Sequence, residues 1–194
     1  MATFTFRGAT MQRVLASLLL ATVACGSDSS GPTTSTLQND DFTSGGSSAT
    51  FVAGFGTGEA AAARLGPKTA AFTIHRVEFF FGGSSTPHTV TLTIYQDGDS
   101  VNPGTPIYSH DYPLTPSDAS FQAIDLTGQD LHVAANQKIR VAITFSHNGL
   151  PSVARDGALT PARNLLFLNP GGWVTAESVG VPGDFIIRTE ISTP

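Results

Sequence analysis

The sequence predicts an all-β protein folded as an antiparallel β-sandwich, jelly-roll-like, with about 8–10 short strands. In several stretches apolar residues recur at every second position, which is typical of half-buried strands. Turns rich in Gly, Pro, Asn and Asp separate these stretches. The alternation of strand and helix patterns that indicates a parallel sheet does not recur along the chain.

The clearest strand pattern is TVTLTIYQ, residues 89–96. Val90, Leu92 and Ile94 point to one face, while the intervening threonines and Tyr95 point to the other. The other strand candidates, in chain order, are residues 48–56, 71–82, 105–112, 120–126, 131–134, 138–146, 164–169, 171–176 and 184–192.

Two local features depart from this pattern. Within residues 71–82 the apolar phase shifts between Ile74 and Val77, which predicts a β-bulge near His75-Arg76. Residues 58–66, GEAAAARLG, contain consecutive alanines with a glutamate before them and a glycine after them. Because alanine has the highest helix propensity, we expect one short helix or helical turn there.

The N-terminus has the order of an export signal. Arg7 and Arg13 precede an apolar run over residues 14–24, and no acidic residue occurs before Asp28. The run is too short for a membrane-spanning helix, which needs about 20 apolar residues. We therefore expect residues 1–24 to be a signal peptide that is removed, and the protein to be exported.

Small and polar residues dominate the next segment. Between positions 25 and 48 only Leu37 and Phe42 are sizeable apolar side chains. Such a composition buries too little surface to repay the entropy lost on ordering. The sequence predicts a flexible Ser/Thr/Gly-rich tether over residues 25–48 and one β-sandwich domain over residues 49–194.

The residues Thr22-Val23-Ala24-Cys25 resemble the lipobox of bacterial lipoproteins. That resemblance implies a diacylglyceryl group on the sulfur of Cys25, cleavage just before it, and a membrane partner reached through the lipid. Gly26 in place of an aspartate is similar to the outer-membrane pattern, so we expect the bacterial outer membrane or cell surface. The alternative is an ordinary signal peptide that leaves Cys25 as a free thiol. A single cysteine cannot form an intramolecular disulfide.

Charge excludes one class of partner. The formal net charge is −5 and the ten basic residues are scattered. Proteins that bind nucleic acid rely on clustered Lys and Arg, so we expect no nucleic-acid partner.

Two glycine-rich or acidic loops invite comparison with known binding motifs. Residues 97–102, DGDSVN, resemble the first half of a calcium loop, which makes Asp97, Asp99 and Asn102 candidate calcium ligands. Glu59 and Asp156 are more distant candidates. A hairpin loop rich in Asp, Asn and Gly is the alternative. The glycines of GFGTGE, residues 54–59, lack the spacing of a dinucleotide fingerprint.

No catalytic signature is found, and no catalytic residue or other cofactor is expected. The histidines lack a G-x-S-x-G or H-E-x-x-H context. Ser109, His110 and Asp111 are adjacent, but neighbours on a strand point to opposite faces. A carboxylate pair for glycoside hydrolysis would be assembled in space, so the sequence leaves that alternative open.

Aromatic residues with a polar tip are the candidate ligand contacts. Tyr95, Tyr108, Tyr112 and Trp173 could stack on sugar rings. Trp173 follows two glycines, as expected of a residue at the edge of a loop. The alternative for each ring is a place in the core.

From residue 72 onward the chain resembles a jelly-roll module of large secreted and surface proteins of environmental bacteria. The matching stretches are FTIHRVEFFFGG, TVTLTIYQDGD, PGTPIYSHD, FQAIDL, RVAITF, PSVARDG, GGWV and GDFIIRTEI. The resemblance implies a fold and an extracellular setting. We expect a lipid-anchored surface protein with a non-catalytic binding or structural role toward polysaccharide or another surface protein. The alternatives are a polysaccharide-active hydrolase, or an accessory module of one, and a structural component of the cell envelope.

Overall fold

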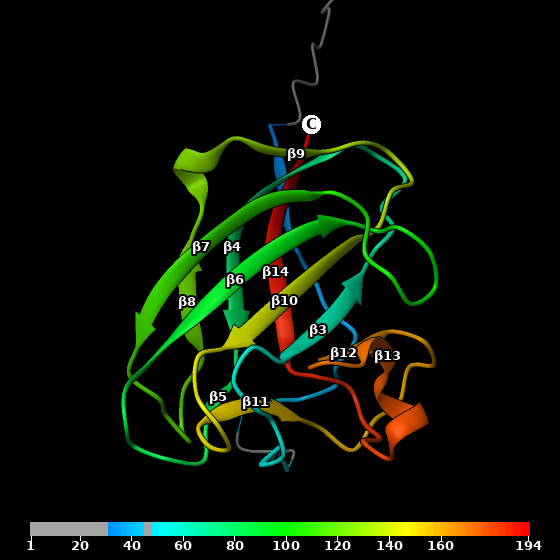
Figure 1. Ribbon diagram of the computed structural model, residues 1–194. Helices are drawn as coiled ribbons and strands as arrows, with labels where there is room; N and C mark the ends of the chain where they lie inside the picture. The colour runs from blue at the N-terminus through cyan, green and yellow to red at the C-terminus, as the bar shows by residue number, and fades with distance from the viewer. Residues whose placement is uncertain (1–30, 45–47) are drawn as a thin grey trace, which may run out of the picture.

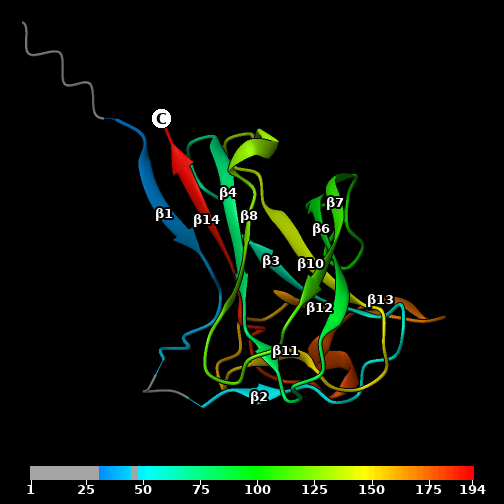
Figure 2. The same ribbon diagram turned by 90° about the vertical axis from the view of Figure 1, so that its left-hand side faces the viewer.

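A computed structural model describes residues 31–44 and 48–194. Antiparallel sheets pack face to face as a sandwich (Figures 1 and 2), so the predicted all-β class is confirmed. The predicted signal peptide and Cys25 lie outside the described residues. In the described part of the chain, no helix has the length and hydropathy needed to cross a bilayer.

One layer is a five-stranded sheet in the order β1-β14-β4-β8, with β9 also paired to β4. Its strands are β1 (Thr33–Leu37), β14 (Ile187–Thr193), β4 (Phe72–Phe79), β8 (Gln122–Asp125) and β9 (Leu131–Val133). A 3-10 turn, η1 (Thr127–Gln129), joins β8 to β9.

The other layer is a six-stranded sheet in the order β13-β12-β3-β10-β6-β7. Its strands are β13 (Gly172–Thr175), β12 (Asn164–Leu168), β3 (Ala60–Leu65), β10 (Ile139–Phe145), β6 (His88–Gln96) and β7 (Pro106–Leu114). A second 3-10 turn, η2 (Ala176–Val179), follows β13. A small sheet at one end of the sandwich contains β2 (Thr50–Phe51), β11 (Ser152–Arg155) and β5 (Phe81–Gly82).

The core lies between the two large sheets and follows the predicted alternation. Val90, Leu92 and Ile94 on β6 are each 0% exposed. They belong to one apolar cluster with Ile187 and Ile191, which β14 contributes from the opposite sheet. Burial of such side chains stabilises each sheet only when the other covers it, which is why the sheets pack as a pair.

The predicted bulge is confirmed in β4. Arg76 pairs with Glu190 of β14, and the next pair is Ile74 with Ile191. His75 is therefore the extra residue on its strand. The extra residue reverses the alternation of the side chains that follow it. As a result, the apolar residues before and after the bulge all point into the core.

The expected helix at residues 58–66 is wrong, because Ala60–Leu65 forms β3 near the middle of the six-stranded sheet. Ala61, Ala62 and Ala63 are 0% exposed, with β10 and β12 paired on either side. Long-range pairing here overrides the local helix propensity of alanine.

The fold also begins earlier than the expected boundary at residue 49. Residues 33–37 form β1, paired with β14 along its whole length. Leu37, Asp40 and Phe42 are buried. The expectation of a flexible tether over residues 25–48 therefore does not hold for residues 33–44, since a neighbouring strand supplies the partners that the segment cannot supply itself.

Candidate functional site

The outer face of the six-stranded sheet carries a row of side chains that crosses every strand. Residues directly opposite each other in antiparallel strands point to the same face. The pairing therefore aligns six residues, which we call the outer row: Trp173, Phe167, Ala60, Thr144, Thr91 and Asp111. The row is aromatic at the β13 end and polar at the β7 end.

Tyr95 of β6 lies outside the outer row and contacts its first member, Trp173. Their rings meet edge to face with centroids 6.1 Å apart, and Phe167 contacts Trp173 in the same manner at 5.6 Å. Trp173 and Tyr95 are half-buried and pack against a small apolar cluster on the outer face. The cluster contains Ala62, Ala142 and Leu165. The structure thus brings two of the four predicted ligand aromatics into one surface.

The polar end of the outer row is fixed by side-chain hydrogen bonds between β6 and β7. Thr91 Oγ1 donates to Asp111 Oδ1 at 2.6 Å, and the hydroxyls of Thr93 and Ser109 are 3.1 Å apart. Asp111 and Ser109 remain exposed. These groups keep free lone pairs or donors that can bind a hydroxylated ligand.

Arg140 lies beneath Trp173 and is 0% exposed. Its guanidinium carbon is 5.9 Å from the centre of the indole ring. Nη2 donates to the carbonyl oxygens of Asp97 at 3.0 Å and Asp99 at 3.1 Å, and Nη1 donates to the carbonyl of Val101. Burial lowers the pKa of Arg140 below its usual value, and the charge of Asp97 opposes that effect.

In the loop that contains the candidate calcium ligands, the carboxylate oxygens accept hydrogen bonds from N–H groups of the protein. Arg64 donates from Nε and Nη2 to the Asp97 carboxylate, at 2.5 and 2.6 Å. Asp99 accepts hydrogen bonds from the backbone of Val101 and Asn102 and from the Asn102 side chain, and these bonds lower its pKa. In residues 31–44 and 48–194, no group of three or more His, Cys, Asp or Glu side chains could hold a metal ion.

The two distant calcium candidates lie in other parts of the fold. Glu59 accepts from the backbone of Gly56 at 2.7 Å and of Asn169 at 3.2 Å. Asp156 accepts from the backbone of Asp41 at 2.7 Å and of Ala158 at 3.0 Å. Each carboxylate ties together chain segments that are distant in sequence, which is a structural role.

Tyr108 and Tyr112 lie on the opposite face of the sheet from Trp173. They pair with Ile94 and Val90, whose side chains point into the core. The two hydroxyls are 2.5 Å apart, and burial raises the pKa of Tyr112 above its usual value. The structure therefore separates the four predicted aromatic contacts into two pairs on opposite faces of one sheet.

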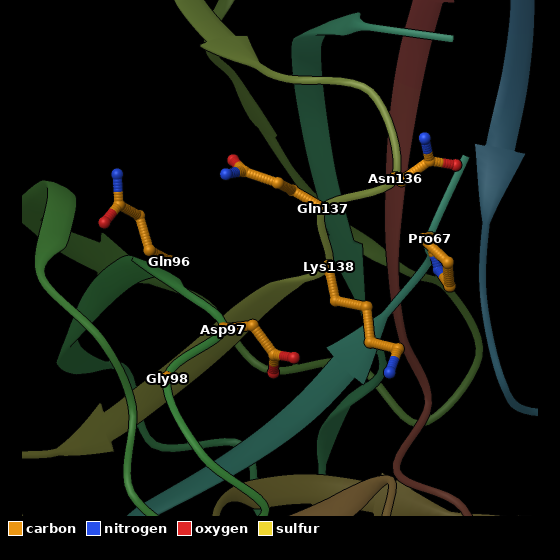
Figure 3. A pocket seen from close by; sticks show the side chains of 7 residues that line it. All are labelled: Pro67, Gln96, Asp97, Gly98, Asn136, Gln137 and Lys138. Atoms are coloured by element: carbon orange, nitrogen blue, oxygen red, sulfur yellow. The ribbon is translucent and has the colours of Figure 1, made fainter. Parts of the chain in front are cut away.

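A polar hollow of about 380 Å³ lies where β6 ends and β10 begins (Figure 3). Its lining residues are Pro67, Gln96, Asp97, Gly98, Asn136, Gln137 and Lys138. Three of these side chains are amides, and Asp97 and Lys138 are the charged residues of the lining. The hollow is separate from the outer row.

Sequence reasoning did not identify Arg140 as part of the site. Arg140 falls within the strand candidate over residues 138–146, between Ile139 and Val141. A long cation between apolar neighbours is a weak signal for a buried residue, because the same pattern describes an ordinary exposed position.

Two buried carboxylates outside the outer row, those of Asp184 and Asp40, accept hydrogen bonds from other groups of the protein. Asp184 is 0% exposed and accepts from the backbone and the hydroxyl of Thr160, at 2.9 and 2.7 Å, and from Asn164. Asp40 is held by Arg188. These bonds describe an internal polar network that joins loops to strands.

Comparison with known proteins finds no matching family model, no similar curated sequence and no similar solved structure.

Proposed function

We propose that this protein is exported, anchored to a bacterial membrane by a lipid on Cys25, and binds carbohydrate through the outer face of its six-stranded sheet. The observation that supports carbohydrate binding is the outer row itself, which runs from Trp173 on β13 to Asp111 on β7, with Tyr95 of β6 packed against the Trp173 ring. The export signal and the lipobox resemblance support the anchor.

The chemistry of the outer row suits a sugar chain. The C–H faces of a sugar ring pack on aromatic rings, while its hydroxyls require donors and acceptors. The row offers the aromatic contact at Trp173 and the polar contacts at Thr91 and Asp111. Six strands span about 24 Å, at about 4.8 Å between neighbours, which is long enough for several sugar residues.

The charge of this surface favours a neutral glycan. Asp111 is the exposed ionisable residue of the row, while Arg140 is buried beneath Trp173. The chain as a whole has a net charge of −5. A polyanionic polysaccharide would be repelled by this surface, whereas neutral hydroxyl groups can hydrogen-bond to the Asp111 carboxylate.

The binding proposal is tested with a panel of neutral polysaccharides and the purified protein, followed by titration calorimetry on any ligand found. Trp173→Ala should weaken binding by about 30-fold, because removing a central aromatic anchor typically costs about 2 kcal/mol. Tyr108→Phe, which changes a ring on the opposite face, is the matched control and should bind as the wild type does.

Because Trp173 also covers apolar side chains, a second variant separates binding from folding. Asp111→Asn leaves the aromatic cluster intact and should alter affinity without changing the unfolding midpoint. Wild-type affinity in both Trp173→Ala and Asp111→Asn would contradict the proposed surface. So would the absence of binding to every neutral polysaccharide in the panel.

The anchor is tested separately by the intact mass of protein from the membrane fraction. The expected mass is that of the chain from Cys25 onward plus acyl groups, and Cys25→Ala should lose it. An unmodified wild-type protein released to the medium would contradict the anchor and leave the sugar-binding proposal standing.

A further inference from the structure

The end of the sandwich where β1 begins is formed by a set of neighbouring loops. In the five-stranded sheet Thr33 pairs with Thr193, Ser192 with Thr73, and Thr73 with His132. The start of β1, the C-terminus, the start of β4 and β9 are therefore level with one another. Figures 1 and 2 show these segments at the same end of the molecule.

Two loops complete this end: residues 66–71, which join β3 to β4, and residues 134–138, which join β9 to β10. We call these two loops the anchor end. The backbone N–H of Asn136 donates to the carbonyl of Lys68 at 2.7 Å, so the two loops form one surface. Most of their residues are exposed.

The composition of the anchor end differs from that of the whole chain. Its sequences are GPKTAA and AANQK, which contain no acidic residue although the chain has a net charge of −5. Lys68 and Lys138 are the chain's two lysines, and both lie here. Neither makes an ion pair within the residues that the structure describes.

Two hollows open at this end. The polar hollow in Figure 3 is lined by Lys138, by the amides of Gln96, Asn136 and Gln137, and by Asp97, whose carboxylate is paired with Arg64. A second hollow, of about 540 Å³, lies beside β9. Its lining is mostly apolar: Ala71, Phe72, Thr73, His132, Val133, Ala134 and Pro194. Small apolar residues, amide groups and unpaired amines are the chemistry that suits the headgroup layer of a membrane.

The length of chain between the anchor and the fold limits where the membrane can lie. Residues 26–32 separate Cys25 from β1, and seven extended residues reach at most about 25 Å. β4 alone, with 8 residues, extends about 26 Å away from the anchor end. The opposite end, with β2, β5 and β11, is therefore the far end of the molecule from a lipid on Cys25.

We infer that the anchor end rests against the anionic headgroups of the membrane that holds the lipid, with Lys68 and Lys138 contacting lipid phosphates. This orientation rests on the proposed lipid anchor. It leaves the outer row and the loops at the opposite end accessible from solution. The short link and the early start of β1 make the fold a membrane-apposed domain rather than one held away on a long tether.

The test counts amine labelling at individual lysines. The lipidated protein carrying Ser85→Lys is reconstituted in vesicles of phosphatidylcholine and phosphatidylglycerol, which contain no amines, and treated with a membrane-impermeant acetylating reagent. Ser85 is exposed and lies between β5 and β6, at the end opposite the anchor end, so its replacement provides an internal control. Peptide mass spectrometry then gives the labelling rate at each site.

The measured quantity is the labelling rate of Lys68 or Lys138 divided by the rate at position 85. This ratio should be about fivefold lower in the lipidated protein than in lipid-free Cys25→Ala protein. The factor corresponds to the binding free energy of about 1 kcal/mol that a surface lysine contributes at an anionic membrane. Equal relative rates in a protein that floats with the vesicles would overturn the orientation alone. A protein that fails to float would overturn the anchor, and the orientation with it.

Discussion

Asp40 and Arg188 are 148 positions apart in sequence and form an ion pair. The Asp40 carboxylate is fully buried and accepts hydrogen bonds from Arg188 Nε at 3.1 and 3.2 Å. Arg188 also donates to the carbonyl of Phe42, and its guanidinium lies 4.8 Å from the ring centre of Phe121. One cation on β14 thus holds the segment that follows β1.

Asp40→Ala should lower the free energy of unfolding by about 3 kcal/mol, because it leaves a largely buried guanidinium without its counter-ion. Burial raises the pKa of Asp40 above its usual value, against the opposing effect of Arg188. Asp40→Asn also removes the counter-ion, but its side-chain oxygen still accepts hydrogen bonds from Arg188, so it should cost less. Urea unfolding at pH 7 measures both, and an equal loss in the two variants would contradict this account.

Arg140→Lys should loosen the loop over residues 97–104. Lysine has one amino group on a flexible stem and cannot satisfy the carbonyls of Asp97, Asp99 and Val101 together. Leaving partly buried carbonyls unpaired costs about 1 kcal/mol. Hydrogen exchange of the loop amides and the unfolding midpoint are the measurements.

The matched control for that substitution is Arg76→Lys on β4, whose side chain is 45% exposed and pairs with Glu78 at 3.4 Å. Exposed pairs contribute little, so its unfolding free energy should change by no more than about 0.5 kcal/mol. If Arg140→Lys behaved in the same way as this control, the loop would not depend on the guanidinium.

Ala61→Leu should destabilise the fold by about 1–3 kcal/mol, because Ala61 is 0% exposed in the core and the larger side chain has no space. Ala70→Leu, at an exposed loop position, is the control and should change little. Thermal unfolding compares the two. A stabilised Ala61→Leu protein would indicate that residues 58–66 are not held in a strand.

The sequence predicted strands where one face is buried and the other exposed. β14 alternates between buried and half-buried residues, because its inner residues face the opposite sheet. β6 and β10 alternate in sequence between large apolar residues and other residue types, although the outer residues of β10 are largely buried as well. β3 has no such contrast, since alanines cover both of its faces and its neighbours, β10 and β12, are distant in sequence. β1 is mostly threonine and serine, and its pairing with the C-terminal strand has no local signal.

The candidate site was predictable as a set of residue types but not as an arrangement. Trp173 and Tyr95 meet because β13, β12, β3, β10 and β6 are neighbours in that order, and strand order depends on contacts across the whole chain. The same order places Tyr108 on the inner face. Alternation along one strand shows only which residues of that strand share a face. It does not show which residues of other strands lie beside them.

His88 and His147 should make stability depend on pH. Their rings are stacked with centroids 3.8 Å apart and planes 20° apart. His147 Nε2 donates to the carbonyl of Pro151 at 2.7 Å, since a carbonyl can only accept. Burial, with a smaller effect from the charge of His147, lowers the pKa of His88 below 6.5. The unfolded chain then binds more protons than the folded one below about pH 6.5.

The folded state should therefore lose stability as the pH falls below about 6.5, and the loss should level off below the pKa of His88 in the folded protein. His88→Phe keeps a ring against His147 but cannot titrate, so its unfolding midpoint should fall less than that of the wild type between pH 8 and pH 5. His110→Gln, at an exposed position on β7, is the control and should follow the wild type. Identical pH profiles for His88→Phe and the wild type would show that the stacked pair does not link folding to proton binding, whereas a flatter profile in His88→Phe alone would locate the linkage at His88.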